Sequence, residues 1–263
     1  MTVLLSTYDQ EVRAVPPAAR RGLVIETDGP VRRTLSARGG MIDYPHLSGL
    51  TGAGLDDLIA RQREHFAGLG RSVEWVTHSH DEPADLPARL LAAGFAESET
   101  GTILTGRGED LATPAPPPVG AEIREVSTER DFQRIAAMQG TVWGIEAGWL
   151  VPQLTGQQAA EPDRWTFLVA EADGEVVSAG WMRFLPGRFA KLYGGATLPE
   201  WQGRGIYRAL VAARAQRALA RGHEFLVVDA SASSRPILQR LGLIPLTTRI
   251  SYHWHPERPV TVD

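Results

Sequence analysis

The sequence predicts a mixed α+β protein in which a mostly antiparallel, twisted sheet is flanked by helices. Apolar alternation and helical stripes both recur along its 263 residues. In the second half, three consecutive strand candidates are joined by short turns, as in an antiparallel meander. A Pro-rich segment interrupts the pattern, because consecutive prolines favour an extended spacer. We therefore expect a smaller αβ unit over residues 1–111, a linker over 112–120 and a second unit over 121–263.

Composition restricts the class of function. The chain is 43% hydrophobic and 22% charged, which is typical of a globular protein. It has no cysteine, so disulfides, thiolate nucleophiles and Cys-based metal sites are excluded. Its net charge of −4 gives no basic field for nucleic acid or anionic lipid. With no long apolar run and no signal-peptide pattern, we expect a soluble cytoplasmic protein without a membrane or nucleic-acid partner.

The first unit is expected to contain a hairpin, two helices and further strands. Residues 23–27 and 31–35 form two strands about an Asp-Gly-Pro turn. A helix over 55–69 has its apolar stripe at Leu55, Leu58, Ile59, Gln62 and Phe66. A strand at 72–76, a helix at 86–93 that ends at Gly94, and a strand toward 103–104 follow.

The second unit begins with a strand over 121–126 and a helix over 128–138, capped by Ser127 or Thr128. An irregular region with short helical patches is expected over 142–163. Strands at 165–170, 176–184 and 189–196 form the meander. The remaining expected elements are a helix at 206–221, a buried crossover strand at 225–229, a helix at 235–241 and a strand at 248–254.

A glycine-rich loop between a strand and a helix is the most informative motif. Gln202-Gly203-Arg204-Gly205 precedes the helix that starts at Ile206. Glycines permit close backbone approach, and the unpaired amides of a first helical turn attract an anion. Arg204 and Arg208 are placed to add contacts at the rim. The spacing matches neither the ATP-type nor the NAD-type loop, so neither nucleotide is supported.

The order of meander, Gln-x-x-Gly loop, long helix, buried strand and a helix ending in Leu241-Gly242-Leu243 resembles the GNAT family of N-acetyltransferases. The resemblance covers about residues 121–255. It implies acetyl-CoA as cosubstrate, with its pyrophosphate on the loop and its pantetheine beside a strand that splays from its neighbour. Ser233 or Ser234 would cap the helix beside the thioester. The residues implied for cofactor binding are Ala196, Thr197, Gln202, Gly203, Arg204, Gly205, Ile206, Tyr207 and Ser233.

Two positions depart from the family pattern. Tyr207 stands where the family usually has Gly or Ala, which suggests altered packing or a stacking role. Leu238 stands where a tyrosine often protonates the departing thiolate, so the acid is unassigned. The catalytic candidates are Glu200, Ser231 and Tyr252, with Glu146 and Asp229 as further bases and Tyr193 as a further acid. Positioning alone supplies a large part of a rate enhancement, so Leu238 does not imply inactivity.

The acceptor region is expected in the segment before the meander, where Trp143 and Glu146 are the substrate-binding candidates and Trp149 lies nearby. Two His-x-His pairs, 78/80 and 253/255, have a chelating pattern but no clear third ligand, so no metal is expected. Lys191 is the single lysine among 27 basic residues, which we interpret as base composition. No hydrolase motif occurs.

Residues 22–106 resemble the C-terminal half of the same fold, since Ala93-Gly94-Phe95 parallels Leu241-Gly242-Leu243. No Gln-x-x-Gly loop precedes them, so this unit is interpreted as a degenerate GNAT-like partner. It would border the acceptor site or form a homodimer interface.

The sequence thus predicts an acetyl-CoA-dependent N-acetyltransferase that moves an acetyl group directly to a primary amine of a small molecule or peptide. Two alternatives stay open. One is a non-catalytic CoA- or acyl-CoA-binding module, and the other is an interaction domain that binds no nucleotide.

Overall fold

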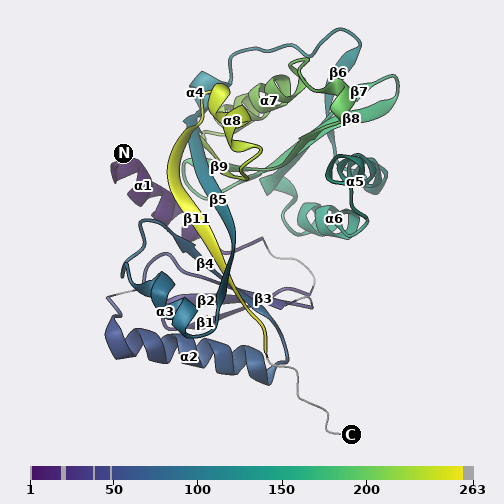
Figure 1. The fold of residues 1–263 in the computed structure, drawn as a ribbon. Coiled ribbons are helices and arrows are strands. Elements are labelled where there is room, and N and C mark those ends of the chain that lie inside the picture. Colours follow the sequence, from purple (N-terminus) through teal and green to yellow (C-terminus); the bar gives the residue numbers. More distant parts are fainter. Residues whose placement is uncertain (1, 19–21, 38, 48, 257–263) are drawn as a thin grey trace, which may run out of the picture. The chain divides into compact units, whose positions relative to one another are not determined.

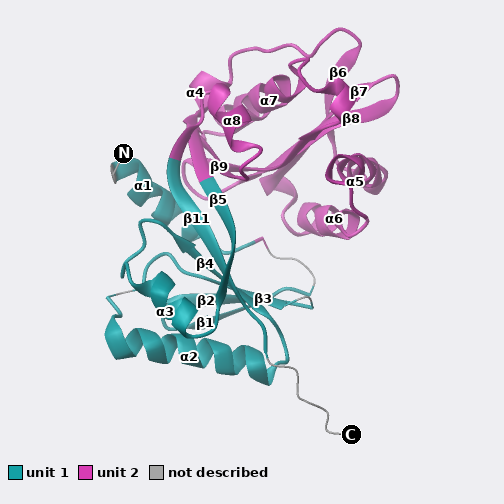
Figure 2. Cartoon of the chain, viewed as in Figure 1, with its two compact units in different colours: residues 1–17, 22–102, 246–263 teal, residues 18–21, 103–245 magenta. Residues whose placement is uncertain are grey.

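The computed structural model describes residues 2–18, 22–37, 39–47 and 49–256. The chain divides into two compact units, coloured separately in Figure 2. Unit 1 comprises residues 1–17, 22–102 and 246–263, and unit 2 comprises residues 18–21 and 103–245.

Unit 1 is an α+β unit with the strand order β1-β2-β3-β4-β11-β5. Neighbouring strands pair antiparallel in β1/β2, β2/β3 and β4/β11, and parallel in β3/β4. Its elements, labelled in Figure 1 except for η1, are α1 (Thr2–Tyr8), η1 (Asp9–Arg13), β1 (Val24–Asp28), β2 (Val31–Ser36), β3 (Gly39–Asp43), α2 (Gly52–Gly68), β4 (Val73–His78), α3 (Leu86–Ala92), and the larger parts of β5 (Ala96–Arg107) and β11 (Ile244–Trp254).

The predicted hairpin and first long helix are confirmed. β1 and β2 pair in register about Gly29, whose φ of 58° requires the left-handed conformation that glycine adopts freely. The buried residues of α2 are the five of the predicted stripe. The four apolar ones pack with Trp75 of β4 and Leu90 of α3 in one apolar core. Helical periodicity alone was therefore enough to orient α2.

Unit 2 has the strand order β5-β10-β9-β8-β7-β6. Its elements are the end of β5, α4 (Gly108–Leu111), β6 (Ala121–Val126), α5 (Glu129–Trp143), α6 (Leu150–Ala160), η2 (Pro162–Arg164), β7 (Trp165–Ala172), β8 (Glu175–Phe184), β9 (Phe189–Thr197), η3 (Pro199–Trp201), α7 (Ile206–Ala220), β10 (Phe225–Ala230), α8 (Arg235–Arg240) and the start of β11.

The predicted meander and crossover are confirmed. β6 to β9 pair antiparallel in sequence order, and β10 pairs parallel with β9 after the crossover through α7. The β7–β8 turn places Asp173 and Gly174 at positive φ, the backbone of a hairpin turn that follows the strand twist. One face of the sheet packs on α5 and α6, and the other packs on α7 and α8.

The region expected to be irregular contains a continuous helix, so that expectation is wrong. α6 spans 11 residues, and Leu150 and Leu154 lie on its buried side. α6 was not predicted because its amphipathic pattern is weak and Pro152 and Gly156 lie inside it. The helix forms because packing against the sheet compensates for its low helix propensity. The start of α5 follows expectation, since Thr128 and Asp131 form a reciprocal capping box.

The compact units divide at other positions than the Pro-rich segment. Residues 112–120 join α4 to β6, and both of these elements belong to unit 2. α4 is fixed there because the Gly108 amide donates to Glu224 O and Leu111 packs in the same core as Leu243. The expected boundary at 112–120 therefore lies inside a unit rather than between two.

The last strand of each half of the chain, β5 or β11, lies beside a strand of the other half. The β4-α3-β5 segment of the first half parallels β10-α8-β11 of the second half. In unit 1, however, β4 pairs with β11, and in unit 2, β10 neighbours β5. β11 begins at Ile244, four residues before the expected start, and carries residues 246–254 into unit 1.

Among the described residues, no helix combines the length and apolarity needed to cross a membrane.

Candidate functional site

The candidate site lies in unit 2, where β9 and β10 separate. These strands pair at three positions, the last of which joins Lys191 to Val227. β9 continues to pair with β8 as far as Thr197, so its other edge diverges from β10 over residues 192–197. The two parallel strands thus splay, as the resemblance implied, and leave backbone groups along an opening.

A β-bulge marks the middle of this opening. The β8–β9 register shifts between Ala179 and Trp181, and Gly194 has a φ of 59°. A Cβ on Gly194 would lie 1.9 Å from the Trp181 ring, so glycine is required there for space as well as for conformation. The bulge was not predicted, although a Gly-Gly doublet inside a strand is a sequence signal for one.

Gln139 of α5 supports the bulge and was missed by the sequence analysis. Its side chain is fully buried, and Nε2 donates to Gly194 O at 2.5 Å. Its Oε1 is buried with no hydrogen-bond partner among the described residues. The available signal was its spacing from Phe132 and Ile135, which places a polar residue on the apolar stripe of α5.

The Gln202–Gly205 loop has the geometry of an anion cradle. Gly203 and Gly205 have φ values of 73° and 85°, and an added Cβ at either position would meet nothing within 4 Å. The Gln202 Nε2 donates to Thr197 O at 3.1 Å and so ties the loop to the end of β9. α7 begins at Ile206, and its N-cap residue Gly205 supplies no side-chain cap, so the amides of the first turn have no capping side chain beside the loop.

Neighbouring side chains anchor the loop and supply charge. Ile206 is 1% exposed and fixes the start of α7 in the core. The Arg204 guanidinium lies 4.7 Å from the centre of the Trp201 ring, and Arg208 is exposed on the first turn. The loop therefore combines open amides, left-handed glycines and positive charge, which together suit a pyrophosphate.

Ala196 and Thr197 close the splayed edge of β9 beside this loop. Ser178 donates to Ala196 O at 2.7 Å, and its hydroxyl lies 2.8 Å from Thr197 Oγ1. Both residues are more than nine-tenths buried, so the end of β9 is held firmly against β8.

Tyr207 fills space on the α7 side of the opening. A Cβ on Gly195 would lie 2.6 Å from the Tyr207 ring, so the ring lies directly on the bulge. Tyr207 also packs on the core that contains Leu238, the position where the family often has its tyrosine. The two departures from the family pattern therefore adjoin the same apolar core.

Arg214 is an unexpected buried cation next to Tyr207. It has no exposed surface, its Nε donates to Leu210 O, and its Nη2 has no partner among the described residues. Gly180 leaves room for it, since a Cβ there would lie 2.7 Å from Arg214 Nη1. Burial lowers the pKa of Arg214, while Tyr207 opposes that shift.

The start of α8 differs from the expectation that Ser233 or Ser234 caps it. Ser234 precedes the helix without making a side-chain cap. Instead, Ser231 Oγ accepts from the Ser234 amide at 3.3 Å and lies 2.9 Å from Ser233 Oγ. Ser231 makes this contact because the turn brings its hydroxyl within bonding distance of an amide three residues later in the chain.

The catalytic candidates do not all lie together. Ser231 follows β10 directly, and Glu200 is exposed on η3, beyond the end of β9. Tyr252 belongs to unit 1, where it is 2% exposed in the core with Trp75 and Trp254. The expected grouping of these three residues is therefore not found, because β11 carries Tyr252 out of unit 2.

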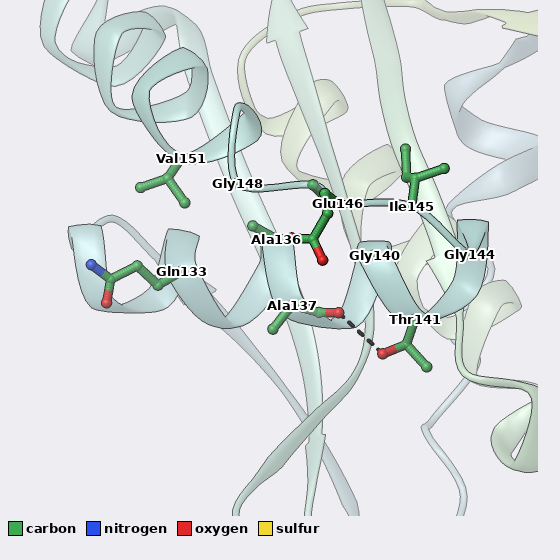
Figure 3. Close-up of a pocket in the computed structure, with 11 residues that line it drawn as sticks. Gln133, Ala136, Ala137, Gly140, Thr141, Gly144, Ile145, Glu146, Gly148 and Val151 are labelled. Carbon is green, nitrogen blue, oxygen red and sulfur yellow. Dashed lines mark hydrogen bonds between the residues drawn. The ribbon is translucent and has the colours of Figure 1, made fainter.

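The acceptor candidates lie at the end of α5. A groove of about 640 Å³ runs between α5 and residues 144–148, and Glu146 lines it together with Gly140 and Val151 (Figure 3). The Glu146 side chain lies over Ala136 and Ala137 of α5 in this view. Trp143 is 42% exposed at the end of α5 and is not among the lining residues.

The His-x-His pairs lie in unit 1. The His80 ring bonds to Thr247 Oγ1 at 2.7 Å and to Asp9 at 3.1 Å, and the Tyr8 hydroxyl lies 3.3 Å from His78 Nε2. Within the described part of the chain, no group of three or more His, Asp or Glu residues is arranged to hold a metal ion.

The segment that carries the site matches a known family model. Residues 126–243 match the model of the acetyltransferase (GNAT) family. The matched segment includes α5, the meander, the loop, α7, β10 and α8. No curated protein matches the chain.

Solved structures share the fold along nearly the whole chain. A GCN5-related N-acetyltransferase from Kribbella flavida is 17% identical, with a TM-score of 0.70 and coverage of 91% of this chain and 92% of that one. A tandem GNAT protein from the clavulanic acid biosynthesis pathway is 14% identical, with a TM-score of 0.67 and coverage of 97% and 93%. At these identities the likeness establishes the fold, which is the GNAT fold.

Proposed function

We propose, on the premise that residues 126–243 form a domain of the GNAT acetyltransferase family, that the protein is an acetyl-CoA-dependent N-acetyltransferase. The acetyl group would pass directly to a primary amine of a small molecule or peptide. The observation that carries this proposal is the uncapped first turn of α7 behind two left-handed glycines, next to the splay of β9 and β10.

The residues present fit the phosphate part of acetyl-CoA. Gly203 and Gly205 leave open space where any side chain would obstruct an anion, and Arg204 and Arg208 lie beside it. The Ile206 and Tyr207 amides would donate to the pyrophosphate, and the splayed edge of β9 would hold the pantetheine. When bound, acetyl-CoA supplies an activated thioester carbonyl.

The chain would contribute orientation and proton transfer. The bulge at Gly194 interrupts the β8–β9 register beside the opening, where a backbone donor would stabilise charge that develops on a carbonyl oxygen. Asp229 on β10 and Glu200 on η3 are the proposed bases for the amine proton. Ser231 and Tyr193 are the proposed donors to the leaving thiolate. Orientation of this kind is worth about 7–11 kcal/mol of the barrier.

A thermal-shift experiment tests the cofactor site. At 100 times its dissociation constant, acetyl-CoA should stabilise the protein by about 2.7 kcal/mol, which raises Tm by several degrees. Gly205→Glu should abolish the rise, because its carboxylate would repel the pyrophosphate. Gly222→Glu is the matched control, since Gly222 has a φ of 80° and an equally open Cβ position but lies at the other end of α7. A wild-type Tm that is unchanged by acetyl-CoA would refute the proposal.

The second candidate function is a CoA- or acyl-CoA-binding module without transfer activity. Tyr207 favours it, because its ring lies on the bulge and narrows the α7 side of the opening. Release of free thiol from acetyl-CoA, measured with and without an amine panel, separates the two functions. Amine-dependent release supports the transferase. Binding without release, accompanied by tighter binding in Tyr207→Ala, supports the module.

A further inference from the structure

The single lysine of the chain lies at the point where β9 and β10 separate. Lys191 pairs with Val227 at the last paired position, and the splay begins directly after it. Side chains alternate along β9, and Ala190 and Leu192 pack in the core with α7 and α8. Lys191 and Tyr193 therefore project toward the face covered by α5 and α6. The other 26 basic residues are arginines.

Lys191 is half-buried and has no anionic partner in the described part of the chain. Its Nζ lies 5.4 Å from the centre of the Tyr193 ring, and Tyr193 in turn packs beside Trp165. No carboxylate among the described residues lies within ion-pair distance of Lys191. The ammonium thus rests on an aromatic ring, where a cation is stabilised but its hydrogen-bond donors remain available.

The charged groups nearest Lys191 lie on the neighbouring strands. Arg183 is the neighbour of Lys191 on β8, and Glu161 neutralises it with two hydrogen bonds of 2.9 and 3.0 Å. Asp229 lies on the same face of β10, two residues beyond Val227 and therefore farther along the opening. A positive group at the start of the opening is thus followed by a negative group farther along it.

On the proposed function, we expect the acceptor to approach from this face. The Gln202–Gly205 loop and the first turn of α7 stand on the opposite face, so the cofactor would enter there. At about 3.3 Å per residue, Lys191 lies about 10 Å along β9 from the bulge at Gly194. The Lys191 Nζ lies beside the ring of Tyr193, which is nearer the bulge than Lys191 is, so the ammonium would hold an anion a few bonds from the reacting nitrogen.

We infer that Lys191 binds the carboxylate of the acceptor and that the acceptors are amino acids. This inference rests on the proposed N-acetyltransferase function and specifies its substrate class. The Lys191 ammonium would hold the carboxylate at the start of the opening, and Asp229 would attract the amino group toward the bulge. A diamine would bind poorly, because one of its cations would face Lys191.

Matched acceptors test the assignment. The probes are free amino acids, their carboxamides and a simple diamine, each assayed by thiol release. For the wild type, we expect kcat/KM to be about 10- to 100-fold higher for the acid than for its amide, with the difference in KM. Lys191→Met should remove this preference while kcat is kept, and Lys191→Glu should reverse it. Arg130→Met is the control, since Arg130 is exposed on α5.

A binding measurement without cofactor gives an independent readout. Calorimetric titration of the preferred amino acid should show binding to the wild type and to Arg130→Met, and at least tenfold weaker binding to Lys191→Met. Melting curves confirm that each variant is folded, with Lys191→Gln as the substitute if Lys191→Met is not. If acetyl-CoA produces no thermal shift, the proposed function fails. If transfer occurs but acids and amides react alike in wild type and Lys191→Met, only the present inference is refuted.

Discussion

Asp81→Asn should be strongly destabilising, because this carboxylate is the centre of a buried network in unit 1. Asp81 accepts from both terminal nitrogens of Arg13, at 2.7 and 3.1 Å, and from the Tyr44 hydroxyl at 2.7 Å. It also accepts from the backbone amide of His78 at 2.8 Å. The side chains of Arg13 and Asp81 are 6% and 7% exposed, so water cannot replace these bonds.

The magnitude follows from what the substitution leaves behind. Asparagine keeps the volume but offers one acceptor oxygen and introduces an amide donor among donors. Arg13 would keep its bonds to Asp9 and to Tyr44 O, yet it would lose the carboxylate that compensates its burial. Breaking one partner of a buried ion pair costs about 3–5 kcal/mol. Since Arg13 retains Asp9, we expect about 3 kcal/mol and a Tm lower by about 6–12 °C.

The assay is chemical and thermal unfolding of four proteins: the wild type, Asp81→Asn, Arg13→Met and the double variant. Removing Arg13 removes the stranded charge, so the double variant should be more stable than the sum of the single effects predicts, by at least 1 kcal/mol. Asp57→Asn is the control, because Asp57 is exposed on α2. A Tm of Asp81→Asn within 1 °C of wild type, or additive effects in the double variant, would refute the reasoning.

Three further perturbations test other parts of the fold. Arg214→Met should stabilise unit 2 by about 1–3 kcal/mol, since it removes a fully buried cation that has no carboxylate partner among the residues described; a loss of stability in denaturant titrations would contradict this. Gly194→Ala should lower Tm markedly, because its Cβ would lie 1.9 Å from the Trp181 ring. Gly148→Ala should not, because a Cβ at Gly148 would meet nothing within 4 Å. Equal effects of the two substitutions on Tm would show that the bulge is dispensable. Hydrogen bonds from Arg124 and Arg134 lower the pKa of Glu171, so its ionised form stabilises the fold above its ordinary pKa of 4.5, and this contribution is lost as pH falls through the lowered value. Glu171→Gln should therefore cost about 0.5–1 kcal/mol at pH 7 and nothing at a pH below both pKa values, and a Tm difference from wild type that is independent of pH would disprove the linkage.

Local sequence patterns were sufficient to predict most of the helices and strands and the Gln202–Gly205 loop. The buried stripe of α2, the capping box of α5 and the Asp-Gly turn of the meander each depend on residues within one or two turns of each other. Helical periodicity, capping and turn conformation are properties of the local backbone, so the sequence specifies them directly. The Gln202–Gly205 loop is local in the same sense, and its glycines have the left-handed backbone that an anion cradle needs.

Long-range pairing was decided by the tertiary structure. β5 and β11 are both suitable partners for β4, and no local pattern indicates that β4 pairs with β11. That choice moved Tyr252 into the core of unit 1 and placed residues 112–120 inside unit 2. The burial of Gln139 and Arg214 and the contact of Lys191 with the Tyr193 ring depend on the surrounding elements in the same way. By itself, the sequence determined which segments are helices, strands and an anion loop, because those depend on neighbours along the chain. Only the folded sheet decided which side chains share the site, because strand pairing joins residues that are distant in sequence.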